Sequence, residues 1–375
     1  MFTLSLATKV LIAYVGVLAI ANLIGGLTTI FVEQDHVNET TDTVSDILTI
    51  NELSSLQERS TTLLETARAL FDQFVGDVNY QHDYAFQVFS GTLPVVATYQ
   101  NFDVETFPSP APADVNANGI SKNFSFYYKE TAPSVSLLDN SSLLDNSHGP
   151  IVRTNPAYAG LYMGFEDGLW RHVPYMDVGT ELRTMQYTCL ADNLLTVGYD
   201  PRCRDWYVPA KADQINVHFS PPYADASTGL IMITISRAVV VSSSLVGVVG
   251  ADVTLDALAQ VVLSATILEN GYTYLCDELK NLIVHPLLSS PSTVFKVTEL
   301  EFDVAAEQEI LNFNALLDNH VLLGQTGQES FVKGGDKWYV TYGPVEGTGY
   351  FMLMVVPESD VIEPAVSVET YADAS

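Results

Sequence analysis

The spacing of apolar residues changes along the chain, and each change predicts a different kind of element. No charged residue occurs from Val10 to Val32. Residues 33–78 then place leucine and isoleucine at mixed helical spacings without a proline, which predicts one long helix. From residue 123 onward, runs of β-branched and aromatic residues predict strands.

The uncharged segment is long enough to cross a hydrocarbon core of ~30 Å as a helix. Lys9 precedes it, and Glu33 and Asp35 follow it. This charge bias predicts a cytoplasmic N-terminus and an extracellular location for the rest of the chain. The alternative is a cleaved signal peptide, but the apolar region of such peptides usually has only ~7–15 residues. We therefore expect residues 1–32 to be a signal-anchor in the plasma membrane.

The strand patterns fall into two groups, which are separated by a predicted helix at residues 256–268. The first group lies between residues 123 and 252, and the second begins at Tyr272. This division predicts two α/β modules, at residues 79–258 and 259–360. Residues 361–375 would then be a tail that leads toward a second membrane span.

The composition restricts the classes of partner. Sixteen Lys and Arg residues against 45 Asp and Glu residues give a formal net charge of −29. Nucleic acids and anionic membrane surfaces both require basic patches, so the charge argues against them. An acidic surface of this kind keeps a globular protein soluble.

Motifs of enzymes and metal sites are not found in the sequence. It contains no Gly-x-Ser-x-Gly, no phosphate-binding Gly-x-x-x-x-Gly-Lys and no His-Glu-x-x-His. The seven histidines are scattered, and His285 has no cluster of metal ligands near it. We therefore expect no enzymatic activity, no metal and no cofactor.

Three short segments carry the candidate chemistry. In the first, the Arg204 guanidinium offers a fork of donors that matches a carboxylate, and the Trp206 indole can add another donor. Tyr199, Asp225 and Asp252 can accept from an ammonium group and neutralise it. A free α-amino acid carries both groups. The alternative is a loop-anchoring cluster, in which Arg204 pairs with Asp200 or Asp205 and the aromatic rings are core.

These segments resemble the amino-acid-recognition motif of the double Cache family of extracellular sensor domains. The motif is a Tyr, an Arg five residues later, then Trp-Tyr, an Asp after Pro-Tyr, and an Asp closing a Gly-Val-Val-Gly strand. The positions that match it are Tyr199, Arg204, Trp206, Tyr207, Asp225 and Asp252. The resemblance covers about residues 33–360 and implies two PAS-like Cache modules with antiparallel sheets on a long N-terminal helix.

The resemblance also implies residue roles and a function. Arg204 and Trp206, helped by Tyr223, would hold the ligand carboxylate, and Tyr207 would line or brace the pocket. The first module would be membrane-distal and would bind a free amino acid or related amine as the sensing part of a membrane receptor. The alternative is an accessory or scaffold subunit of a membrane complex, as with calcium-channel auxiliary subunits. The partner would be a second copy through the stalk helix, or another membrane protein.

In the expected extracellular location, cysteines can form disulfides and Asn-x-Ser/Thr sequons can be glycosylated. Cys189 and Cys203 flank the approach to the motif and are expected to form a disulfide, the alternative being two buried thiols. Cys276 lies in an apolar strand pattern and is expected to be a buried thiol. In a eukaryotic secretory lumen, Asn38, Asn123 and Asn140 would be glycosylation acceptors.

Overall fold

The computed structural model describes residues 34–93, 125–127, 133–174, 182, 184–225, 229–264, 267–288 and 292–362. The expected membrane segment, at residues 1–32, lies outside this part of the chain, as do residues 363–375 of the expected tail. Within the described ranges, no helix combines the length and the apolar character that a membrane crossing requires.

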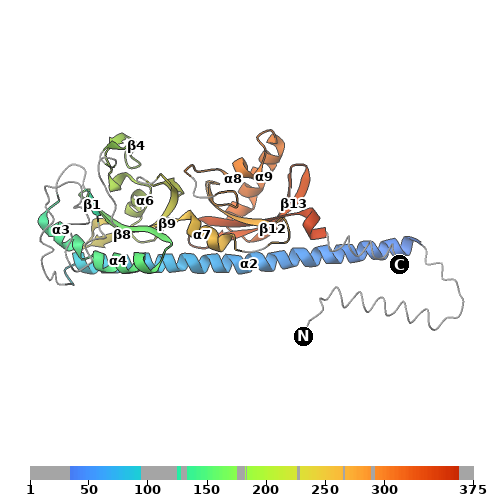
Figure 1. Cartoon of the computed structure of the whole chain (residues 1–375), viewed down its shortest axis with the longest axis horizontal. Helices are drawn as coiled ribbons and strands as arrows, with labels where there is room; N and C mark the ends of the chain where they lie inside the picture. Colours follow the sequence, from blue (N-terminus) through green and yellow to red (C-terminus); the bar gives the residue numbers. More distant parts are fainter. Residues whose placement is uncertain are drawn as a thin grey trace, which may run out of the picture.

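One helix, α2 (Gln34–Phe89), runs the length of the molecule (Figure 1). Its 56 residues extend over about 84 Å at 1.5 Å per residue. The sequence analysis expected this helix to end at residue 78. It continues to Phe89 because Val78, Ala85 and Val88 prolong its buried face. Gly91 follows with a φ of 75°, a left-handed conformation that is common just after a helix.

Two antiparallel sheets lie side by side along α2 (Figure 1). The first has seven strands in the order β1-β3-β2-β9-β8-β6, with β7 also paired to β8. We call the module built on it the distal module. Its strands are β1 (Ser125–Tyr127), β2 (Tyr158–Phe165), β3 (Trp170–Val173), β6 (His218–Phe219), β7 (Tyr223–Ala224), β8 (Ile231–Val241) and β9 (Ser244–Thr254).

Different elements pack on the two faces of the distal sheet. On one face lie α2, α3 (Val135–Ser142) and α4 (Asp145–Thr154). On the other lie η3 (Pro201–Cys203), α6 (Tyr207–Ala212) and the hairpin of β4 (Gln186–Thr188) and β5 (Leu195–Val197). Figure 1 shows α6 and β4 on the side of the sheet away from α2.

Alternation along the strands decides which side chains reach each face. On β2, Leu161 and Met163 pack in the core that includes α2, whereas Tyr162 between them belongs to a separate aromatic cluster. On β9, Ala251 and Val253 belong to the α2 core, and Asp252 between them points to the opposite face. The face away from α2 is therefore the one that can carry a polar site.

The second module, here the proximal module, follows α7 (Leu255–Val262). Its sheet has five antiparallel strands in the order β11-β10-β14-β13-β12. Its elements are β10 (Tyr272–Asp277), β11 (Leu282–Val284), α8 (Val297–Glu301), α9 (Glu307–Asn319), η4 (Val321–Leu323), β12 (Gly327–Lys333), β13 (Asp336–Val345) and β14 (Tyr350–Pro357).

Both sheets share one apolar core with α2. Leu56 and Leu64 of α2 pack in the same cluster as Met352 and Met354 of β14, and Phe74 packs there with the distal strands. A second cluster fills the space between the proximal sheet and α9. The expected fold of two helix-and-sheet modules with antiparallel sheets on a long N-terminal helix is confirmed. The helix between the modules, α7, ends six residues before the expected residue 268.

Candidate functional site

A pocket lies on the face of the distal sheet that points away from α2. The cavity is narrow, with a volume of about 20 Å³, and about 360 Å³ of space lies among its lining residues when the part open to solvent is included. The residues that line it are Tyr162, Trp170, His172, Leu182, Tyr199, Arg204, Trp206, Tyr223, Asp225 and Asp252. Five of the residues expected from the motif, together with Tyr223, therefore meet in one cavity.

Arg204 is a buried cation that makes no ion pair with the described residues, although the charge of the neighbouring Asp205 acts on it and helps to raise its pKa. Its side chain is 9% exposed, and within the described residues no carboxylate forms an ion pair with it. The Nε atom is buried and unbonded. The guanidinium carbon instead lies 5.3 to 5.8 Å from the ring centres of three tyrosines, Tyr187, Tyr199 and Tyr223. Asp200, one alternative partner named by the sequence analysis, pairs with Arg202.

Asp252 is a buried carboxylate that is bonded through one oxygen. Its Oδ1 accepts from Tyr162 at 2.5 Å, Thr234 at 2.6 Å and Tyr223 at 3.2 Å. No hydrogen bond to Oδ2 is formed within the described part of the chain. Burial raises the pKa of Asp252 to about 7 against the lowering effect of these donors, and the nearby Asp225 adds to the rise.

Two tyrosines lie between the opposite charges. Electrostatic effects of both Arg204 and Asp252 act on the phenols of Tyr199 and Tyr223. Burial raises the pKa of both phenols, so both are neutral near pH 7. The Trp206 indole donates a hydrogen bond to Tyr199. Trp206 therefore lines the pocket, and its indole N–H already has a partner.

Asp225 lines the pocket, whereas Tyr207 lies behind its lining. Asp225 follows β7 and lines the pocket, close enough to raise the pKa of Asp252. Tyr207 is not a lining residue. Its ring packs against Trp206 at 5.4 Å, and its hydroxyl donates to Glu166 at 2.7 Å. Tyr207 therefore packs behind a lining residue, and its role toward a ligand stays a prediction.

The sequence analysis did not identify four of the lining residues. Tyr162, Trp170, His172 and Leu182 line the pocket but belong to no motif that it weighed as a site. Trp170 and His172 lie two residues apart on β3, so both point to the same face. On β2, Tyr162 pairs with His172, and Gly160 leaves room for the imidazole: a Cβ atom there would lie 2.2 Å from His172 Nε2. The alternation of side chains along β3 was a sequence signal that could have placed Trp170 and His172 on the same face.

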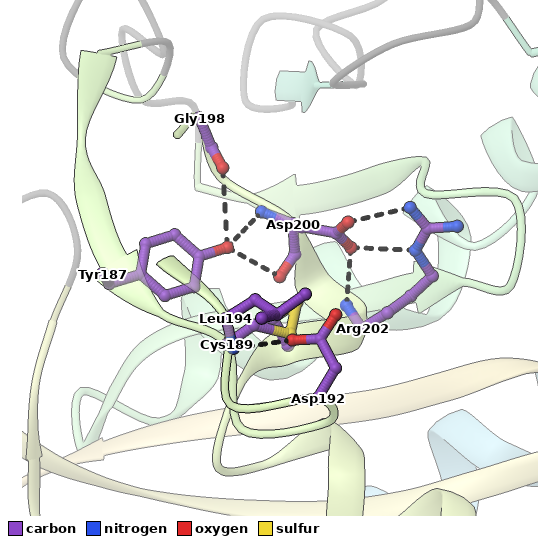
Figure 2. Close-up of a disulfide and its surroundings, with 8 residues drawn as sticks. Tyr187, Cys189, Asp192, Leu194, Gly198, Asp200 and Arg202 are labelled. Carbon is purple, nitrogen blue, oxygen red and sulfur yellow. Dashed lines mark hydrogen bonds and ion pairs between the residues drawn. A yellow bond between two sulfur atoms is a disulfide. The ribbon is translucent and has the colours of Figure 1, made fainter. Parts of the chain in front are cut away.

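The loop before Arg204 is held by a disulfide and by two polar clusters (Figure 2). Cys189 and Cys203 are joined, with Cα atoms 4.6 Å apart. The Tyr187 hydroxyl accepts from the Asp200 amide at 2.8 Å, and the Asp200 carboxylate binds the Arg202 guanidinium at 2.8 and 2.9 Å. These bonds fix the turn of η3, after which Arg204 enters the pocket. Cys276 is a buried free thiol.

The other expected sites are less defined. Asn140 lies within α3 and is partly buried, and the Ser142 hydroxyl of its sequon donates to a backbone carbonyl. The Asn38 side chain and Asn123 lie outside what the structure describes, and glycosylation stays a prediction at all three positions. Across the described ranges, no group of three or more His, Cys, Asp or Glu residues could hold a metal ion.

Comparisons with known proteins give relatives in bacterial chemotaxis. Methyl-accepting chemotaxis protein PscA of Pseudomonas syringae pv. tomato is 30% identical over 128 residues, covering 31% of this chain and 20% of that protein. TlpB of Bacillus subtilis is 29% identical over 168 residues, covering 44% and 22%. The chain thus spans about a fifth of the length of the curated relatives that it matches.

A solved structure and a family model cover much more of the chain. The ligand-binding domain of the Pseudomonas fluorescens chemoreceptor CtaA, in complex with L-serine, superposes with a TM-score of 0.50 at 17% identity. This match covers 82% of this chain and 97% of that one, and it shows a shared fold. The model of the Cache domain family matches residues 55–365. The chain therefore belongs to the Cache domain family.

Proposed function

We propose that this chain is the ligand-sensing part of a membrane receptor and that the distal module binds a free α-amino acid. The amino acid would lie between Arg204 and Asp252, with its carboxylate on the guanidinium and its ammonium group on the two aspartates. A related amine has no carboxylate and would therefore contact only Asp225 and Asp252. Binding would favour one geometry of the module and thereby act on α2.

The observation that carries this proposal is the separation of two buried charges across one cavity. Arg204 makes no ion pair within the described residues, a buried guanidinium without such a pair is costly, and a ligand carboxylate would relieve this cost. A carboxylate with one unbonded oxygen and a raised pKa would be stabilised in its charged form by an ammonium group. A zwitterion supplies both partners at once.

The receptor part of the proposal rests on the relatives and on the N-terminal sequence. The relatives are named as methyl-accepting chemotaxis proteins, and the uncharged segment at residues 10–32 is long enough to span a membrane. We infer a location in the plasma membrane with the two modules outside the cell. Self-association through α2 or a partner membrane protein would carry the signal onward.

Isothermal titration of the whole chain in a mild detergent tests the binding site. Alanine, ethylamine and propionate form a matched set, because the two latter compounds each lack one charged group of the first. We expect titration of all twenty amino acids to find at least one ligand below millimolar concentration. Of the matched set, alanine should bind most tightly and propionate most weakly, because Asp252 and Asp225 repel an unaccompanied carboxylate.

A lack of any binding at millimolar concentration would favour the alternative function, an accessory or scaffold subunit with a degenerate pocket. Equal binding of alanine and ethylamine would show that Arg204 does not hold a carboxylate. The ligand would then be a simple amine.

A further inference from the structure

A buried hydrogen bond joins the proximal module to the distal one. The Tyr350 hydroxyl, on β14 of the proximal module, donates to the backbone carbonyl of Ser220 at 2.8 Å. Ser220 belongs to the distal module and directly follows β6. Both residues are 2% exposed. Burial raises the pKa of Tyr350, so its phenol keeps the hydrogen that this bond needs. The proximal module therefore holds one point of the distal backbone.

Aromatic packing orients the Tyr350 ring at this junction. Its ring centre lies 5.6 Å from that of Phe71 on α2 and 5.8 Å from that of Phe219 on β6. The ring centres of Phe71 and Phe219 are themselves 5.8 Å apart. Distances in this range are those of favourable aromatic pairs. The long helix and both modules therefore meet in one cluster of three rings, from which the Tyr350 hydroxyl reaches Ser220.

On the distal side, Ser220 is bound to a strand that supports the pocket. Its amide donates to the Thr234 carbonyl and its hydroxyl accepts from the Thr234 amide, both at 2.9 Å. The Thr234 hydroxyl in turn donates to Asp252 at 2.6 Å and lies 2.6 Å from the Tyr223 hydroxyl. Thr234 therefore connects Ser220 to two residues that line the pocket.

The chain between Ser220 and the pocket is short and stiff. Pro221 and Pro222 follow Ser220, Tyr223 comes next, and Asp225 lies two residues later. A proline ring fixes its own φ near −65° and also restricts the residue before it. A displacement of Ser220 would therefore move Tyr223 and Asp225, because the backbone between them has little freedom to absorb it.

We infer that Tyr350 is a positioning residue for the distal pocket, so that amino-acid affinity depends on a contact made by the proximal module. Its hydroxyl holds Ser220 where Tyr223 and Asp225 face the ligand. Linkage is reciprocal, so a ligand that requires this geometry strengthens the contact with Tyr350 by the same free energy. Occupation of the pocket thereby acts on β14 and, through Phe71, on α2. This inference rests on the proposed function, since it assigns a further residue to the same site.

Tyr350→Phe tests the inference, because it removes the hydroxyl and keeps the ring that packs on Phe71 and Phe219. Isothermal titration of the whole chain should show alanine and ethylamine bound more weakly by the variant. Each should lose roughly 2- to 12-fold in affinity, the effect of one hydrogen bond. The two factors should be equal, because both ligands would contact Asp225.

Tyr272→Phe is the matched control. It removes a hydroxyl that donates to Glu301 at 2.6 Å, and both of these residues belong to the proximal module. The control variant should lose a comparable hydrogen bond and still bind alanine and ethylamine as tightly as the unaltered chain. A general loss of stability in the proximal module therefore does not imitate the effect of Tyr350→Phe.

Amide hydrogen exchange follows the same contact in the empty protein. Tyr350→Phe should speed exchange at residues 218–225 and at Thr234, whose amide is bonded to Ser220. Tyr272→Phe should leave exchange there unchanged. In the unaltered chain, saturating alanine should slow exchange in β14, and Tyr350→Phe should abolish this effect. A residue that only supports the fold would not make exchange in one module depend on a ligand in the other.

The outcomes separate this inference from the proposed function. If an amino acid binds the unaltered chain and the Tyr350→Phe variant equally well, the inference is wrong and the proposed function stands. Unchanged exchange at residues 218–225 in this variant would overturn the inference as well. If no amino acid binds but exchange rises at these residues, the proposed function is wrong, and Tyr350 is still the residue that positions the segment.

Discussion

Asp145 and Arg171 form a buried ion pair directly behind the pocket. The Arg171 Nε donates to Asp145 Oδ1 at 2.6 Å, and a second, parallel bond joins Nη2 to Oδ2. Their side chains are 3% and 4% exposed. Arg171 lies between Trp170 and His172 on β3, so it points to the helix-covered face while its neighbours point into the pocket. The pair therefore connects α4 to the strand that forms one wall of the site.

Removal of one partner of this pair should destabilise the distal module strongly. Arg171→Met leaves the Asp145 carboxylate buried without a counterion, which typically costs about 3–5 kcal/mol. Urea unfolding should show a loss of this size. The control is Glu346→Gln, which removes the exposed partner of Arg68 and should cost at most about 1 kcal/mol. Equal effects of the two substitutions would contradict the importance of burial.

The disulfide should stabilise the fold and hold the wall that carries Tyr187. A Cys189→Ala, Cys203→Ala double variant removes a cross-link over a sequence separation of 14, which is worth about 3 kcal/mol. We expect a loss of this order in unfolding experiments. Amino-acid affinity should weaken as well, because Tyr187 on β4 lies against the Arg204 guanidinium.

Alkylation and mass analysis check the bond itself. Denatured protein without reductant should react at Cys276 alone, and reduced protein should react at all three cysteines. Reaction at all three positions without reductant would contradict both the bond and the extracellular location.

The charged residues of the site, Arg204, Asp225 and Asp252, could be predicted from the sequence, but the lining residues of β3 could not. Arg204 and Trp206 lie within one short segment, and the pattern around Asp225 and Asp252 matches a family motif. Trp170 and His172 carry no motif. Their place in the pocket depends on which face of β3 turns away from α2, and this is decided by packing against helices that are distant in sequence.

The fold was predictable to a similar extent. Alternating and helical patterns identified the long helix and both strand-rich modules. The end of α2 was misplaced because Val78, Ala85 and Val88 are buried by contact with the distal sheet, which local spacing does not reveal. Likewise, the sequence showed no cluster of metal ligands near His285, but it did not reveal the partner of this residue, Glu301 at 3.0 Å, which lies on another element.

Variants of the two charged residues should separate the two ends of the ligand. Arg204→Ala should weaken the binding of an amino acid by roughly tenfold to a hundredfold, because a charged hydrogen bond is worth about 1.5–3 kcal/mol. It should affect a simple amine much less. Asp252→Ala should weaken both classes of ligand. If both variants bind the amino acid as tightly as the unaltered chain, the ligand lies elsewhere.

The raised pKa of Asp252 predicts that affinity increases with pH. An ammonium group prefers the ionised carboxylate, and in the empty pocket Asp252 gains its proton below a pKa of about 7. Below that value, affinity should fall by up to about tenfold per pH unit, and above it affinity should level off. Titrations between pH 5 and 8 measure this slope. The Asp252→Asn variant should bind the amino acid more weakly, and its affinity should depend much less on pH.

The stability of the empty protein should change with pH in the opposite direction. Because the folded-state pKa of Asp252 lies above the ordinary value of 3.8, the folded protein binds a proton here more tightly than the unfolded chain. The contribution of Asp252 is therefore fully present below pH 4 and is lost as pH rises through about 7. At 1.36 kcal/mol per pKa unit, the change is at most on the order of 4 kcal/mol.

Asp252→Asn isolates this contribution from that of the many other carboxylates. Unfolding of the unaltered chain and the variant at pH 5 and at pH 8 gives four free energies of unfolding. The variant should gain stability relative to the unaltered chain as the pH rises, because an amide carries no charge to bury. A saturating amino acid should reduce this gain, since its ammonium group would compensate the buried carboxylate. A stability difference that does not vary with pH would mean that Asp252 is ionised throughout, and affinity would then be independent of pH over the same range.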